Sequence, residues 1–137
     1  MEVTNNLTLA GAGSLTMGST YTIIMDNIVN INGSGSITLN GPSNSSSTLP
    51  GTLTIAGSGN FNMGPIWVLQ LTGLNLSGTG SVRATSNTSS SVIQVFGAIT
   101  ETGSGLIDLS FGSTSDNRIE FMSGCISTAN LQLQTRN

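Results

Sequence analysis

The feature that most restricts the fold of this chain is a recurring Gly-x-Gly step. Five copies occur, at intervals of 22, 24, 21 and 25 residues, and they are Gly11/Gly13, Gly33/Gly35, Gly57/Gly59, Gly78/Gly80 and Gly103/Gly105. A degenerate sixth copy fits Ser127–Ala129. A repeat of this length is one supersecondary unit that cannot bury an apolar face alone, so it must stack on its neighbours.

Apolar residues alternate with polar ones on both sides of each step. Examples are Leu7/Leu9 and Leu53/Ile55 before the glycines, and Leu15/Met17 and Phe61/Met63 after them. Period-two alternation over so short a span predicts a half-buried β-strand on each side. We name these the first and second strands of the repeat. The Gly-x-Gly between them is predicted to be a corner, where glycine supplies backbone angles that other residues resist.

A third apolar stretch closes most repeats. It reads Tyr21–Met25, Trp67–Leu71, Val92–Phe96 and Arg118–Met122, and it is weaker in the second repeat, at Thr48–Leu49. The sequence therefore predicts a single all-β domain over residues 1–137, a three-sided β-solenoid (β-helix-like) of about six coils. A trimeric, intertwined β-prism, in which three chains share one core, fits the same repeat lengths.

Alternation also predicts which side chains face inward and outward. We expect one inward column formed by Leu9, Ile31, Ile55 and Leu76. The first strands should present an outward ladder of Thr8, Asn30, Thr54, Asn75 and Thr100, and the third strands one of Gln70, Gln94 and Glu120. On the second strands, Arg83 and Asp108 should be neighbours and form an exposed ion pair of little energetic weight.

The connection between the second and third strands varies in length. It is long at Gly41–Thr48, Ala84–Ser91 and Ser110–Asn117. All three connections leave the same corner, so they should cluster on one edge, where the insertions of a solenoid often form a binding surface. The candidate binding residues are Ser43, Asn44, Ser45, Ser46, Asn87, Thr88, Ser113, Thr114, Asp116 and Asn117.

Charge and composition exclude several classes of partner. The net charge is −3, with three arginines, no lysine and no histidine. A nucleic-acid interface needs clustered Lys or Arg, so no nucleic acid is expected. No apolar run approaches the roughly 20 residues of a membrane span, so no membrane insertion is expected. The first residues show no signal-peptide pattern, and the single Cys125 excludes an intrachain disulfide.

Residues that could carry catalysis are also missing. Without His or Lys, a serine nucleophile lacks its usual base. The acids are too dispersed for a Ca²⁺ loop, and the Gly-x-Gly steps open no helix that could hold a dinucleotide. We therefore expect no catalytic residue, cofactor or metal, and no enzyme activity. The nearest acid pairs, Glu101 with Asp108 and Asp116 with Glu120, leave a polysaccharide-active β-helix as a minor alternative.

Four stretches carry a resemblance: LTLAGAGSLTMG, VNINGSGSITLNG, LTIAGSGNFNMG and LNLSGTGSVRAT. They resemble the β-repeat regions of bacteriophage tail fibres, head fibres and other virion surface proteins, and also the stalk repeats of bacterial adhesins. The resemblance is one of texture over nearly the whole chain, without a signature motif. It implies a non-enzymatic β-rod that displays loops: a virion fibre, spike or capsid-decoration protein, assembled in the host cytoplasm.

The same resemblance implies partners. These are further copies of the chain, with a homotrimer favoured, together with other virion proteins or a host surface glycan or receptor. An initial Met, short length and no export signal favour the virion over an adhesin. The alternative is an adhesin-type binding module, extracellular or on the cell surface. The alternation of Thr and Asn along the first strands also suggests ice binding, as a third possibility.

Overall fold

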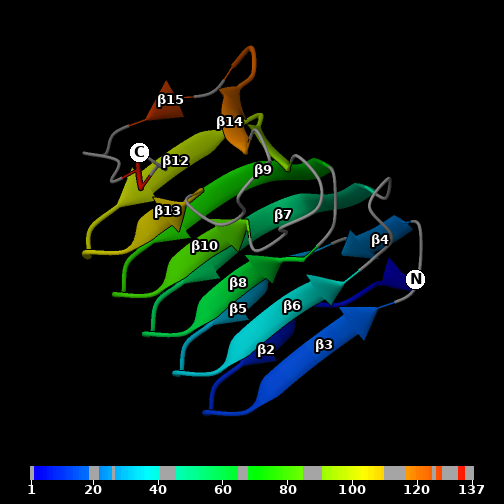
Figure 1. Ribbon diagram of the computed structural model, residues 1–137, viewed down its shortest axis with the longest axis vertical. Helices are drawn as coiled ribbons and strands as arrows, with labels where there is room; N and C mark the ends of the chain where they lie inside the picture. Colours follow the sequence, from blue (N-terminus) through cyan, green and yellow to red (C-terminus); the bar gives the residue numbers. More distant parts are fainter. Residues whose placement is uncertain are drawn as a thin grey trace.

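A computed structural model describes residues 2–18, 22–25, 27–40, 46–64, 68–84, 91–109, 117–124, 126–127 and 133–134. Within these residues all regular structure is β, and the strands stack in parallel as a solenoid (Figure 1). One chain buries a continuous apolar core by itself. Of the two predicted architectures, the structure is therefore the single-chain solenoid.

The second strands of the repeat form one six-stranded sheet, which we call the second face. Its strands lie side by side in chain order (Figure 1). They are β3 (Ser14–Gly18), β6 (Ser36–Asn40), β8 (Asn60–Met63), β10 (Ser81–Ala84), β13 (Leu106–Asp108) and β16 (Leu133–Gln134). Each pairs in parallel with the equivalent strand of the next coil, as the repeat predicts.

The first and third strands belong together to a ten-stranded sheet. The first face contains β2 (Leu7–Leu9), β5 (Val29–Ile31), β12 (Ala98–Glu101) and β15 (Ile126–Ser127), and the third face contains β1 (Glu2–Val3), β4 (Thr22–Met25), β11 (Val92–Val95) and β14 (Arg118–Phe121). Two long strands, β7 (Ser46–Ile55) and β9 (Val68–Leu76), run from the third face of one coil into the first face of the next.

These two strands modify the predicted repeat. The corner expected after the third strand is a bend inside a continuous strand, marked by a register shift between Leu49 and Thr52. In β9 the alternation of buried and exposed residues breaks at Gly73–Leu74, where two successive residues are buried, and this is the same bend. The third strand of the second repeat is also longer than expected, because it begins at Ser46.

The inward columns are as predicted. Leu9 lies opposite Ile31, Ile31 opposite Ile55, and Ile55 opposite Leu76 in successive strand pairs. The last three are fully buried. Full burial of such a side chain stabilises the fold by about 1.5–3 kcal/mol, and here each depends on the coils above and below to cover it.

The corner glycines have a different role from the one predicted. Among the described residues only Gly124 has a positive φ, of 93°, so the Gly-x-Gly corners do not need backbone angles reserved for glycine. Glycine is needed there because the backbones of successive coils approach one another too closely to leave room for a side chain. A Cβ on Gly35, Gly59 or Gly80 would overlap the carbonyl oxygen of the equivalent glycine in the preceding coil. Backbone hydrogen bonds such as Gly59 N–H to the Gly33 carbonyl, at 3.0 Å, keep the coils at this spacing.

The solenoid amounts to about four turns, slightly fewer than the six coils expected. Six levels can be followed on the second face, but the outermost ones are short, since β1, β15 and β16 have two residues each. The last register also differs. Leu133 lies opposite Ile107, two residues later than the predicted partner Leu131, which lies outside the described residues.

Candidate functional site

The predicted loop edge is defined by the strand ends that flank it. The second-face strands β6, β10 and β13 end before the three long connections, and the third-face strands β7, β11 and β14 begin after them. These third-face strands start in register, with Ser46, Val68, Val92 and Arg118 aligned across the sheet. The three connections therefore begin and end along one edge of the solenoid.

Two of the ten predicted binding residues are described. Ser46 is exposed and already belongs to β7, so the loop before it is shorter than predicted. The other eight lie outside the described residues; they are Ser43, Asn44, Ser45, Asn87, Thr88, Ser113, Thr114 and Asp116. Their role in binding stays a prediction.

Asn117, the second described residue, fastens the chain at the base of this edge. Its Oδ1 accepts a hydrogen bond from the Ser91 N–H at 3.0 Å, and its Nδ2 donates to the Leu109 carbonyl at 3.5 Å. These contacts join the two ends of the 110–116 connection and tie them to Ser91, which follows the 85–90 connection. The half-buried Asn117 side chain is thus used for anchoring, and the sequence pattern gave no sign of it.

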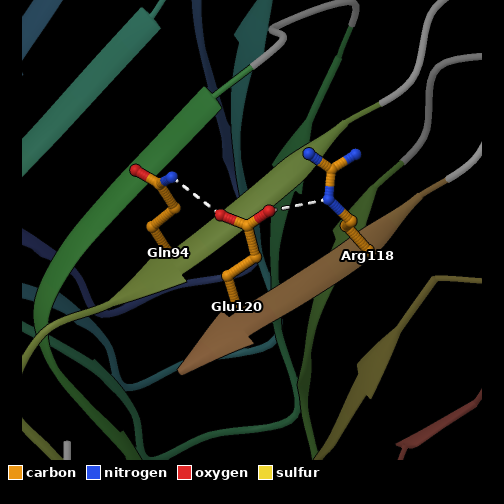
Figure 2. Close-up of polar contacts among 3 residues, drawn as sticks. All are labelled: Gln94, Arg118 and Glu120. Atoms are coloured by element: carbon orange, nitrogen blue, oxygen red, sulfur yellow. Dashed lines mark hydrogen bonds and ion pairs between the residues drawn. The ribbon is translucent and has the colours of Figure 1, made fainter. Parts of the chain in front are cut away.

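A ladder of polar side chains crosses the third face at right angles to the strands. Thr48 Oγ1 donates to Gln70 Oε1 at 3.3 Å, and Gln70 Nε2 donates to Gln94 Oε1 at 3.1 Å. Gln94 Nε2 then donates to Glu120 Oε2 at 2.8 Å, as Figure 2 shows. The predicted stack of Gln70, Gln94 and Glu120 is confirmed, and Thr48 extends it. We call these four residues the third-face ladder.

The last rung of the ladder carries an ion pair. Arg118 Nε lies 2.7 Å from Glu120 Oε1, so the carboxylate accepts one hydrogen bond on each oxygen (Figure 2). The hydrogen bond from Gln94 and then that from Arg118 hold the pKa of Glu120 below its usual value of 4.5. The carboxylate is therefore charged, and its charge is matched by the guanidinium beside it.

One aromatic residue that we did not single out directly follows the strand that carries Gln94. Phe96 follows β11, its backbone N–H bonds to the Leu71 carbonyl at 2.9 Å, and its side chain is 41% exposed. Strand alternation places it on the same side as Gln94, two residues earlier. That spacing was available as a signal, but the repeat pattern had assigned Phe96 only as the end of a strand.

The ion pair predicted on the second face forms, with a different environment. Arg83 and Asp108 are register partners, and Arg83 Nε lies 3.8 Å from Asp108 Oδ2. The Arg83 side chain is 37% exposed, but that of Asp108 is only 8% exposed, so the expectation of an exposed pair is wrong for the acid. Asp108 lies on β13 between two neighbouring strands, with Arg83 of β10 and Gln134 of β16 as its register partners.

The remaining outward positions also stack as predicted. On the first face Thr8, Asn30, Thr54, Asn75 and Thr100 are successive register partners. On the second face Asn62 Nδ2 donates to Thr38 Oγ1 at 3.2 Å. The acids named as a minor enzymatic possibility have other surroundings: Glu120 is paired with Arg118, and Asp108 with Arg83.

The described part of the chain contains no group of three or more His, Cys, Asp or Glu side chains that could hold a metal ion. None of the described residues belongs to a helix long and apolar enough to cross a membrane. The surfaces that the structure does contain are ladders of hydroxyl and amide groups, which can donate and accept hydrogen bonds along a rigid face. No family model, curated protein or solved structure matches this chain.

Proposed function

We propose that this chain is a non-enzymatic virion structural protein, a fibre, spike or capsid decoration, that displays loops on a β-rod for attachment. The observation that supports the proposal most is the solenoid itself: a rigid, charge-poor stack whose long connections all begin and end along one edge. Connections positioned in this way on a rigid scaffold are a common arrangement for binding. We prefer a virion protein to the alternative functions because the sequence resembles bacteriophage fibre repeats in texture.

The proposed protein acts as a homo-oligomer, with a trimer favoured. The described surface leaves large apolar side chains in water, with Ile28 41% and Phe121 52% exposed. A net charge of −3 without lysine supplies little repulsion between copies. A parallel trimer would repeat the loop edge around the three-fold axis and strengthen weak contacts by multivalency.

Two measurements test this proposal. Light scattering on the purified protein should give three times the 14.0 kDa chain mass, and a stable monomer at tens of micromolar would contradict the oligomer. The genes on either side of this one decide the setting: capsid or tail genes support a virion protein. Genes for cell-wall anchoring or secretion would favour the alternative, an adhesin-type surface module, which the same loop-bearing rod also suits.

A further inference from the structure

We propose that the third face binds a neutral saccharide, with Phe96 as a stacking platform and Gln94 and Glu120 as hydrogen-bonding groups. The inference rests on the proposed attachment role, and it places a binding surface on the sheet rather than on the loop edge. It commits to one ligand class, an uncharged sugar chain, because the face combines three properties that such a ligand requires.

The first property is a rigid row of groups that both donate and accept. A glutamine amide has two N–H donors and an oxygen with two lone pairs. In Gln70 and in Gln94 the ladder uses one N–H and one lone pair, and each amide keeps one of each. Sugar hydroxyls also donate and accept, so they match this row. The side chains are held in place by the ladder before any ligand arrives, which lowers the cost of ordering them on binding.

The second property is an apolar plate beside the row. Phe96 leaves 41% of its surface in water although its backbone is fixed by the hydrogen bond to Leu71. An aromatic ring has a negative face that attracts partly positive hydrogens, and the C–H groups on one side of a sugar ring are such hydrogens. A plate with polar groups next to it therefore contacts both the ring face and the hydroxyls of one sugar.

The third property is electrical neutrality. Between β7 and β14 the described charges of the third face are Arg118 and Glu120, which neutralise one another at 2.7 Å. A polyanion such as a sulfated glycan or a nucleic acid finds no excess of positive charge here. A neutral saccharide needs none, so the charge of the face selects it over the charged glycans.

The test uses the full chain on an array of neutral, sialylated and sulfated oligosaccharides, followed by titration calorimetry with the best neutral ligand. We expect Phe96→Ser and Gln94→Ala each to weaken binding by about tenfold or more, since the first removes the stacking ring and the second removes a hydrogen-bonding amide. The matched control is Asn75→Ala, which removes an outward amide from the first-face ladder and should change the affinity by less than about twofold. Circular dichroism checks that each variant is folded.

The following results would overturn the inference. They are no binding to any neutral glycan, a preference for sulfated glycans, and unchanged binding by Phe96→Ser. A fourth is a change of oligomeric mass in Phe96→Ser, because Phe96 would then lie in a subunit interface. If binding instead disappears when residues 85–90 are replaced by a Gly-Ser linker but survives in Phe96→Ser, the attachment role stands on the loops and the third-face inference fails alone.

Discussion

Alanine substitution of two equivalent glycines separates two possible reasons for glycine at the corners: the close approach of neighbouring coils and the backbone angle. Gly13 and Gly59 hold the same position in their Gly-x-Gly corners, and neither has a positive φ, so alanine can adopt the backbone of both. Their surroundings differ. A Cβ on Gly13 has no heavy atom within 4 Å, whereas one on Gly59 would overlap the Gly35 carbonyl oxygen and lie 2.7 Å from Ile31 Cγ2.

The size of the difference follows from these contacts. Gly59→Ala must push two coils apart and strain the hydrogen bonds of Gly59 and Asn60 to the preceding coil, at 3.0 and 3.1 Å. Each such bond contributes about 1 kcal/mol, and overpacking adds about 1–3 kcal/mol, so we expect a loss of about 3 kcal/mol. Gly13→Ala meets no obstacle and restricts the unfolded chain, so it should stabilise by about 0.4–1 kcal/mol.

Urea unfolding followed by far-ultraviolet circular dichroism measures both changes in the free energy of unfolding. For a chain of this size, a loss of about 3 kcal/mol corresponds to a fall in Tm of roughly 10 °C. Equal effects of the two substitutions would show that the corner glycines are not required by the contact between coils. A large loss for Gly13→Ala would show that the backbone angle matters after all.

Three further predictions test other parts of the structure. Glu101 follows Leu76 in the inward column and has a buried oxygen without a hydrogen-bond partner; Glu101→Leu should raise the free energy of unfolding in urea by about 1–2 kcal/mol, while the outward Thr100→Leu should change it by less than about 0.5 kcal/mol. The lowered pKa of Glu120 means that its stabilising contribution is present above 4.5 and is lost as pH falls below that value. Tm measured from about pH 6 to about pH 3 should therefore fall more steeply in the parent than in Glu120→Gln, and parallel curves would contradict the assignment. Arg83→Ala breaks a long ion pair of 3.8 Å and should cost less than about 1 kcal/mol in the same urea assay, whereas a larger loss would mean that the pair holds the two coils together.

The strands, their order and the direction of most side chains could be predicted from the sequence. Two short-range patterns, the alternation along each strand and the distance between glycine steps, determine which residues meet. For this reason the column from Leu9 to Leu76 and the ladder from Gln70 to Glu120 form in the predicted register. In a regular repeat the long-range contacts can be predicted from the sequence, because each residue contacts the equivalent position of the next coil.

What could not be predicted depends on how closely the coils approach. The low exposure of the Asp108 side chain could not be predicted, because period-two alternation assigns the side of the sheet on which a residue lies and not how far its neighbours cover it. The anchoring contacts of Asn117 reach two chain segments whose separation no pattern encodes.

The two kinds of connection also differ in how they would respond to genetic insertions. The first five connections from a first strand to a second strand have four residues each, and the last, between β15 and β16, has five, whereas those from a second to a third strand vary from three to nine. One extra residue between Ile55 and Asn60 would turn the side chains of the following strand to the opposite faces of the sheet. Phe61 would then face solvent and Asn62 would face the core. One extra residue within 85–90 would leave both flanking strands in register. The loop edge is therefore the side on which foreign peptides could be grafted, at intervals set by the strand spacing of about 4.8 Å. The constant length of the glycine corners, in contrast, determines which side chains of the following strands face the core.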